Sequence, residues 1–407
     1  AHNDSGDGGF GPDGDADIIK CGSYTGNAGN PQVIDVGFEP QFLMVKCTSN
    51  SGDWFVVDNM RGVLPNADYG NDNKTIYWNK SDAEIASGNF GFYSTGFAAA
   101  QSSSTNGSGR TFIYMAIRRG SLFPPDDATK VFTPVLGDGS GTPSIKTNHV
   151  TDFGIAFNKT GGGSVVGTRL LGTKQLKTHT NGAEATNSFF NWDFQNGWHT
   201  WTGLNTNYIN WNWKRAPSFC DVTTWSGTGS VRTVPHGLTV PPEMIWVKRR
   251  DSSGSWRVLV NIGGSFTGLA LHNTNAASTA ALPELYGDDT TFTAPTSSVF
   301  TVGASATTNA SGGTFIAVLF ASVANVSKVG SFSHTNGSTT DVDCGFSSGA
   351  RFVLLKRYST TGSWVVFDSV RGIVTGNDPF LKLDTTDAET TGNDVIDPLS
   401  SGFQVAS

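Results

Sequence analysis

Charged side chains are scarce in this sequence. They make up 15% of its 407 residues, with a formal net charge of −7. Its basic residues gather in nothing larger than the triplet Lys248-Arg249-Arg250, and otherwise in doublets such as Arg118-Arg119. Proteins that bind a phosphate backbone do so with clustered Lys and Arg side chains. We therefore expect no nucleic-acid partner.

Cysteine is also scarce, with four residues at positions 21, 47, 220 and 344. They form no C-x-x-C pair and match no pair of histidines, so the spacing fits neither a zinc site nor a disulfide framework. We expect free thiols, which suits assembly in a reducing cytoplasm.

Long apolar runs and helical periodicity are missing as well. The longest apolar stretch, around 315–326, is interrupted by Ser and Asn, so it is too short for a membrane span. Short alternating segments separated by Gly, Asn, Asp and Pro dominate the chain. Alternation with a period of two between turn residues is typical of β-strands, so the sequence predicts an all-β fold and no membrane partner.

One pattern, K-x5-G-x-W-x7-G, occurs three times in the chain. The copies are KCTSNSGDWFVVDNMRG from Lys46, KRRDSSGSWRVLVNIGG from Lys248 and KRYSTTGSWVVFDSVRG from Lys356. Repetition on this scale predicts tandem modules. The short strands around each copy favour β-sandwich or jelly-roll-like modules of about 100 residues. We expect the repeated tryptophans, Trp54, Trp256 and Trp364, to be buried in the core of their own modules.

The repeat divides the chain into an acidic Gly- and Asp-rich segment and four units. The limits are 1–16 for the segment, 17–121 for unit 1, 122–218 for the degenerate unit 2, 219–327 for unit 3 and 328–407 for unit 4. Unit 4 ends at Ser407 without the apolar strand that closes the other units. An open sandwich exposes an unpaired sheet edge, so we expect that the chain continues or that another chain donates the strand.

The acidic segment contains Gly8-Gly9-Phe10-Gly11-Pro12-Asp13, which resembles one turn of a calcium-binding nonapeptide repeat. Such turns bind calcium by stacking on neighbouring turns, and this is a single copy. The spacing also fails the EF-hand loop. We interpret the segment as a flexible acidic linker without a cofactor, and calcium binding is the alternative.

Five of the eleven tryptophans lie between 191 and 214. Alignment with TFIYMAI and TFIAVLF, from units 1 and 3, places Trp211 and Trp213 at apolar positions, and Trp198 also aligns with apolar residues. We expect these three to be buried. Trp192 and Trp201 lie among polar residues and have no apolar counterpart. They form either an exposed patch that stacks on a sugar or a partner, or ordinary half-buried packing.

Units 1 and 4 share an acidic and a basic residue three positions apart, followed by a glycine. These residues are Asp58, Arg61 and Gly62 in unit 1, and Asp368, Arg371 and Gly372 in unit 4. Unit 3 lacks both charges, so the pair is kept together and lost together. This favours a structural ion pair or turn clamp. A catalytic carboxylate would need a histidine or a second carboxylate at a fixed offset, and the sequence has neither there.

The pattern GFEPQFLMVK…W…DNMRG…DAEI…STGF…TFIYMAI resembles the tandem β-sandwich repeats in virion proteins of marine and cyanobacterial tailed phages. The likeness covers units 1 and 4 well, unit 3 less well and unit 2 in outline. It implies a non-enzymatic tail, fibre or decoration protein of the virion, assembled in the host cytoplasm, with structural roles for the motif residues. It also implies other virion subunits, further copies of the chain and a cell-surface glycan as partners.

Two other classes of protein fit the composition. One is a secreted bacterial adhesin or surface-layer protein. The other is the carbohydrate-binding portion of a glycan-degrading enzyme, which would carry its catalytic carboxylates elsewhere.

Overall fold

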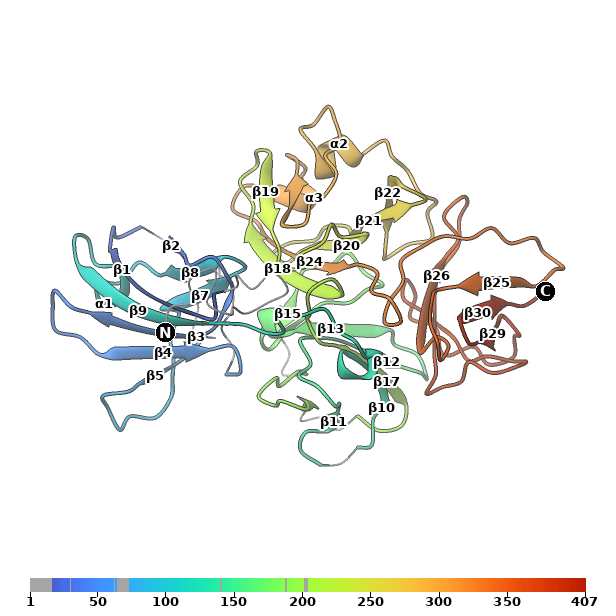
Figure 1. Cartoon of the computed structure of the whole chain (residues 1–407), viewed down its shortest axis with the longest axis horizontal. Helices are drawn as coiled ribbons and strands as arrows, with labels where there is room; N and C mark the ends of the chain where they lie inside the picture. Colours follow the sequence, from blue (N-terminus) through green and yellow to red (C-terminus); the bar gives the residue numbers. More distant parts are fainter. Residues whose placement is uncertain are drawn as a thin grey trace.

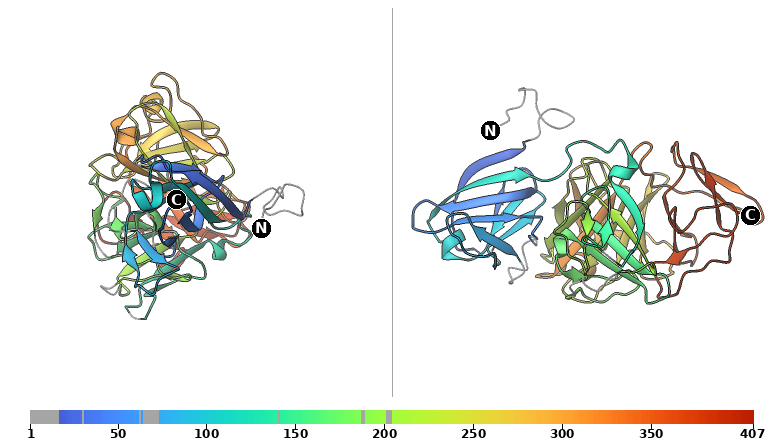
Figure 2. Two further views of the ribbon diagram at one scale, coloured as in Figure 1. Left: turned by 90° about the vertical axis from the view of Figure 1, so that its left-hand side faces the viewer. Right: turned by 90° about the horizontal axis from the view of Figure 1, so that it is seen from below.

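The computed structural model describes residues 17–29, 31–61, 63, 73–139, 141–186, 189–200 and 204–407. The fold is all-β, as the sequence predicts, and consists of four tandem sandwich-like units of antiparallel strands. Unit 1 lies at one end of an elongated molecule and unit 4 at the other, with units 2 and 3 between them (Figure 1). A view from below shows the same order along the long axis (Figure 2).

Unit 1 is a sandwich of two sheets, with strand orders β1-β9-β3-β4-β5-β6 and β2-β8-β7. Its elements are β1 (Ile19–Thr25), β2 (Gln32–Asp35), β3 (Pro40–Cys47), β4 (Trp54–Asp58), β5 (Lys74–Tyr77), β6 (Ile85–Ala86), β7 (Phe90–Tyr93), β8 (Gly96–Ala99), α1 (Ser103–Asn106) and β9 (Thr111–Arg118). In β3, Leu43 and Val45 are buried while Phe42 and Met44 are half-buried. Alternate residues share a face, so one face of the large sheet packs on the small sheet.

Unit 3 repeats this arrangement with the orders β18-β24-β20-β21-β22 and β19-β23. Its elements are β18 (Cys220–Ser226), β19 (Arg232–Pro235), β20 (Met244–Arg249), β21 (Arg257–Ile262), β22 (Ser265–Ala270), α2 (Leu282–Tyr286), β23 (Val299–Val302), α3 (Ala306–Asn309) and β24 (Thr314–Phe320).

Unit 2 has the orders β10-β17-β12-β13 and β11-β16, with β14-β15 as a separate pair. Its elements are a 3₁₀ turn (Ala128–Lys130), β10 (Phe132–Leu136), β11 (Ile145–Lys146), β12 (Phe153–Asn158), β13 (Ser164–Thr168), a second 3₁₀ turn (Arg169–Leu171), β14 (Lys174–Gln175), β15 (Ala185–Thr186), β16 (Gly197–Trp198) and β17 (Tyr208–Trp213).

Unit 4 has two three-stranded sheets, β26-β27-β28 and β25-β30-β29. Its strands are β25 (Thr340–Asp343), β26 (Phe352–Lys356), β27 (Trp364–Asp368), β28 (Leu381–Lys382), β29 (Ile396–Leu399) and β30 (Gly402–Val405). Among the described residues β26 pairs only with β27, whereas its counterpart β20 in unit 3 pairs with both β21 and β24.

The repeated motif forms the same hairpin in units 1 and 4. Lys46 pairs with Trp54 across β3 and β4, and Lys356 pairs with Trp364 across β26 and β27. Each lysine ammonium group donates a hydrogen bond to the carbonyl of the motif glycine in the turn. The K-x5-G spacing therefore closes the turn that sets the register.

Each unit has its own apolar core between its two sheets. A fifth cluster draws residues from units 2, 3 and 4 together, and none from unit 1. It contains the outer faces of the large sheets, meaning the faces turned away from each unit's own small sheet. In these three units both faces of the large sheet are therefore buried.

Trp198 lies inside the sandwich of unit 2, where its indole nitrogen donates to the Asn212 side chain over 2.7 Å. Trp211 and Trp213 are buried as predicted, but they lie between sandwiches. All four cysteines are free.

Candidate functional site

Units 2, 3 and 4 are joined by hydrogen bonds that repeat from one unit to the next. The Trp256 indole of unit 3 donates to the Lys177 carbonyl of unit 2 over 2.8 Å. The Trp364 indole of unit 4 donates to the Ala270 carbonyl of unit 3 over 2.9 Å. These two tryptophans hold the same position in the motif, and each is 1% exposed. They are buried, but in the cluster shared between units and not in the cores of their own modules, which corrects the prediction. Trp54, the third motif tryptophan, is only half-buried.

The third contact closes the set. Unit 2 has Ser164 at the tryptophan position, and its hydroxyl group is bonded to Thr178. Thr178 in turn donates to the Leu383 carbonyl of unit 4. Two indole contacts thus run from unit 3 to unit 2 and from unit 4 to unit 3, and a hydroxyl contact from the same region of unit 2 runs to unit 4. Each of the three units contacts the other two around the shared apolar cluster, so they form a closed ring.

The Asp–Arg pair of unit 4 lies at this junction. Arg371 bonds Asp368 with a nitrogen–oxygen distance of 2.6 Å, and their side chains are 2% and 0% exposed. Asp368 also accepts a hydrogen bond from the Trp211 indole of unit 2 over 3.0 Å. The Arg371 guanidinium lies 5.6 Å from the centre of the Trp211 ring. The predicted ion pair is confirmed, and it has a partner in another unit that the sequence did not suggest.

Within the described part of the chain, the same pair in unit 1 has no hydrogen-bond partner from another unit. Arg61 bonds Asp58 over 2.7 Å, but the two side chains are 22% and 23% exposed. Among the residues predicted to be structural, Gly372 has φ +128°, a backbone conformation that favours glycine. Gly62 lies outside the described residues.

Glutamates of the recurring Ala-Glu dipeptide complete these clamps. Glu84 lies 3.4 Å from Arg61, and Glu389 lies 3.1 Å from Arg371. In unit 2 the corresponding Glu184 pairs instead with the buried Arg250 of unit 3. The dipeptide occurs as Ala83-Glu84, Ala183-Glu184 and Ala388-Glu389. Its recurrence together with the Asp–Arg pair in units 1 and 4 is the sequence signal that could have pointed to the clamp.

A buried group of charges joins unit 1 to the ring. The Arg215 guanidinium bonds both carboxylate oxygens of Glu39 from unit 1 and also bonds Asp221 of unit 3. Arg119 bonds Asp152 over 2.8 Å. These residues are far apart in sequence, and no pattern links them.

The charges of this group offset one another. Burial alone would raise the pKa of Asp152, but three guanidinium groups, those of Arg119, Arg169 and Arg215, hold it below the usual range. Burial also works to raise the pKa of Asp221, and Arg215 again reverses the direction. Ionised and paired carboxylates of this kind fit a structural junction.

A groove of about 680 Å³ runs along the unpaired edge of β26. It is lined mainly by apolar side chains from units 2, 3 and 4, including Trp213, Phe320, Phe332, Phe352 and Phe403. It lies where β24 would stand in unit 3.

The predicted glycan-binding tryptophans fare differently. Trp192 is 5% exposed, which corrects the expectation of an exposed indole. Phe190 stacks on it with a centroid distance of 5.0 Å, and the Arg169 guanidinium lies 5.9 Å from its ring. Trp201 and the acidic segment 1–16 lie outside the described residues. In the part of the chain that is described, there is no group of three or more His, Cys, Asp or Glu able to hold a metal, and no helix suited to crossing a membrane.

Among the described residues, the outer face of unit 1 is the one large-sheet face that contributes nothing to the apolar cluster of the ring. Its apolar residues, from five strands and the turn after β5, are Cys21, Phe42, Met44, Trp54, Val56, Ile76, Trp78, Ile113, Met115 and Ile117. Trp78 is 58% exposed and Ile113 is 39% exposed.

Comparison with known families gives one match, over residues 18–119 and 167–407, to a family described as a domain of unknown function, DUF7483. The match covers more than half of the chain. The chain belongs to the DUF7483 family. The gap in the match falls in the linker and first half of unit 2, the unit that departs most from the repeat. No curated protein and no solved structure matches this DUF7483 chain.

Proposed function

We propose that this DUF7483 chain is a non-enzymatic structural protein of a tailed-phage virion, acting in tail or fibre architecture with attachment to the host surface. The ring of units 2, 3 and 4 carries the proposal. Three related sandwiches bury their outer faces against one another, with indole donors at one repeated position making two of the three links and the Thr178 hydroxyl the third. Such a body is suited to holding its loops at fixed positions.

The motif pattern in units 1 and 4 supports the placement in a virion. The motif residues themselves support a structural role, because Trp256, Trp364 and Asp368 are all occupied in contacts between units. Glycan recognition has less support than assembly, because Trp192 is buried against Phe190 and Arg169.

The test is to locate the chain in particles and cells. Antibodies raised against the recombinant chain would be used for immunogold labelling of purified virions that carry this gene. Mass spectrometry would compare the virions with the envelope and secreted fractions of the host. We expect enrichment in virions and labelling on the tail. Recovery only from the envelope or secreted fraction would contradict the proposal in favour of an adhesin, and glycan cleavage by the purified chain would contradict the non-enzymatic part.

A further inference from the structure

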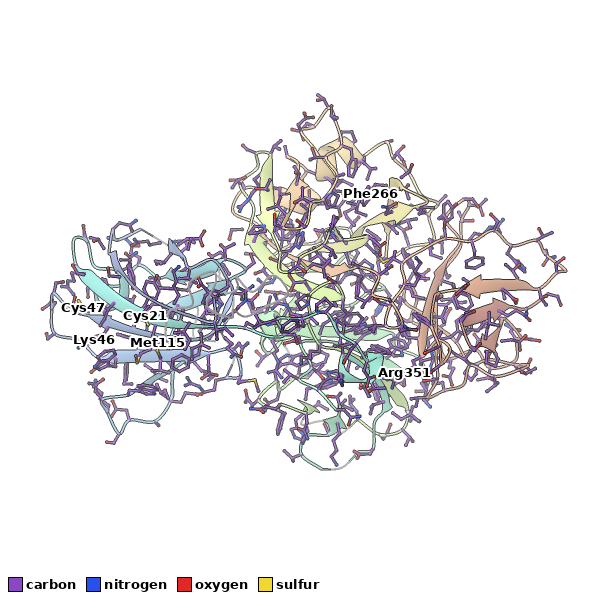
Figure 3. All side chains as sticks on the ribbon, viewed as in Figure 1. Cys21, Lys46, Cys47, Met115, Phe266 and Arg351 are labelled. Atoms are coloured by element: carbon purple, nitrogen blue, oxygen red, sulfur yellow. The ribbon has the colours of Figure 1, made fainter. Side chains whose placement is uncertain are left out.

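The outer face of unit 1 corresponds position by position to faces that are buried in the ring. Met44 pairs with Val56 and Met115. In unit 3, Trp246 pairs with Val258 and Val318 in the same register. The unit 3 residues are 3%, 0% and 2% exposed. In unit 1 Val56 is likewise buried, whereas Met44 and Met115 are only half-buried. Figure 3 labels Cys21, Lys46 and Met115 along the large sheet of unit 1.

The turn after β5 gives the largest contrast in exposure. The backbone N–H of Trp78 bonds the Trp54 carbonyl, as Leu271 bonds Trp256 and Leu383 bonds Trp364. Leu271 and Leu383 are fully buried, at 0% exposed, whereas Trp78 is 58% exposed. A large indole at a position that is otherwise buried between units indicates a surface made for contact.

The motif tryptophan of unit 1 shows the same contrast. Trp54 is half-buried, and its indole N–H makes no hydrogen bond within the described part of the chain. The indole N–H groups of Trp256 and Trp364 each donate to a carbonyl of the neighbouring unit. The acceptors Lys177 and Ala270 correspond to Tyr77 of unit 1. Each of these three residues directly follows the residue that pairs with the central valine of the adjacent strand. Unit 1 therefore has both the indole donor and the carbonyl acceptor of this contact.

We infer that the outer face of unit 1 binds the same face of two further copies of this chain. The three copies of unit 1 then form a ring like the one that units 2, 3 and 4 form within a single chain. In each interface the Trp54 indole of one copy donates to the Tyr77 carbonyl of the next. The contact is head-to-tail, and such contacts form closed rings when the rotation closes. Within one chain the equivalent contacts close into a ring after three units, so we expect three copies of the chain in the assembly.

The Asp–Arg pair of unit 1 fits the same ring. In unit 4 the Asp–Arg pair faces Trp211 of unit 2. Met115 of unit 1 holds the position that corresponds to Trp211. The half-exposed pair Asp58 and Arg61 would then be covered by Met115 of a neighbouring copy. This inference rests on the fold and is independent of the proposed virion function.

The full-length chain would be studied by analytical ultracentrifugation across a range of concentrations. We expect a species of three times the 43.0 kDa chain mass. Trp78→Glu together with Ile113→Glu should abolish it, because both side chains are exposed in the single chain and buried in the ring. Trp54→Phe, which removes the N–H donor and part of the apolar ring surface, should weaken each interface at least about tenfold. Val33→Glu is the matched control, since Val33 is 53% exposed but lies on the small sheet of unit 1.

Protection of Cys21 from alkylation supplies a second readout in a Cys344→Ser background. Cys21 is exposed in the single chain, whereas Val222 at the same position of unit 3 is fully buried. We expect alkylation to slow at least tenfold on assembly. A chain that stays monomeric at its highest soluble concentration would overturn the inference. So would a dimer, a trimer that survives the Trp78 and Ile113 changes, or binding of a glycan at Trp78 by a monomeric chain.

Discussion

At the scale of single residues, the two Asp–Arg pairs show how neighbours decide what one motif does. Both pairs have the same spacing, the same short ion-pair distance and a glutamate beside the arginine. Asp368 is removed from water and bonded to an indole of another unit, while Asp58 keeps contact with solvent. A buried charge that loses its partner costs far more free energy than an exposed one.

Replacing Asp368 should therefore destabilise the chain much more than replacing Asp58. In Asp368→Ala, the buried Arg371 keeps only Glu389 as a carboxylate partner, and the Trp211 indole loses its acceptor. We expect a loss of about 3–5 kcal/mol in the free energy of unfolding. The matched change Asp58→Ala should cost about 1 kcal/mol or less. Urea denaturation followed by tryptophan fluorescence would measure both, and equal losses would contradict this account of the clamp.

Lys248 of the repeated motif should make stability depend on pH. Burial lowers its pKa to about 8, although Asp251 acts in the opposite direction. The unfolded chain keeps the ordinary lysine pKa near 10.4, so between these values it binds more protons than the folded chain. The free energy of unfolding must then rise with pH over this window, by at most about 1.4 kcal/mol per pH unit.

The measurement compares thermal unfolding of the wild-type chain and Lys248→Met from pH 7 to pH 9. Tyrosines and cysteines titrate in both proteins, so the contribution of Lys248 is the difference between the two curves. We expect the stability of Lys248→Met, relative to that of the wild-type chain, to fall as the pH rises. A constant difference would show that the lysine is not held with a lowered pKa.

At the scale of strands and hairpins, the repeat allowed a large part of the fold to be predicted. The alignment placed Trp211 with Val318. In the structure Trp211 of β17 pairs with β12, and Val318 of β24 pairs with β20, so the two residues hold equivalent places in their sheets. Trp198 likewise pairs with Ile145 in its small sheet, as Phe300 pairs with Val234. Alternation of apolar residues fixes which residues share a face, and this local property can be read from one sequence.

What covers the second face of a sheet could not be predicted in this way. The outer faces of units 1 and 3 have similar apolar patterns, but only the face of unit 3 is covered by other units. Trp192 lies between two polar residues in sequence, yet it is buried against Phe190, two residues before it, and beneath the Arg169 guanidinium, 23 residues before it. Which side chains fold over an indole depends on the path of the chain, and alternation along one strand does not record it.

The motif tryptophans give a test at this scale. Trp364→Ala removes a fully buried indole and its hydrogen bond to Ala270, and should cost about 3–5 kcal/mol. Trp54→Ala, at the same position of a half-buried hairpin, should cost distinctly less when the chain is studied at low concentration. Denaturation curves for the two variants would measure the loss in the free energy of unfolding that each substitution causes. If Trp54→Ala were the more damaging, the face of unit 1 would already be closed within the single chain.

At the scale of the whole molecule, unit 1 is held to the ring by charges. Glu39 of unit 1 and Asp221 of unit 3 both bond Arg215 of unit 2, whose side chain is 5% exposed. The charges around Arg215 outweigh the effect of its burial and raise its pKa, so it is cationic throughout the accessible range. The orientation of unit 1 relative to the ring should therefore be fixed.

Arg215→Met should loosen this junction. It removes the cation that Glu39 and Asp221 share and leaves only Arg119, 3.7 Å from Glu39, to offset them. We expect a loss of about 3 kcal/mol in stability. Faster hydrogen exchange at the ends of β3 and β19 and a larger radius of gyration in solution scattering should accompany it. Lys130→Met is the matched control, because Lys130 forms an exposed pair with Asp126 and such pairs contribute about 1 kcal/mol or less. If Arg215→Met left exchange and scattering unchanged, unit 1 would be held by apolar contacts, and the ion group would be a consequence of its docking.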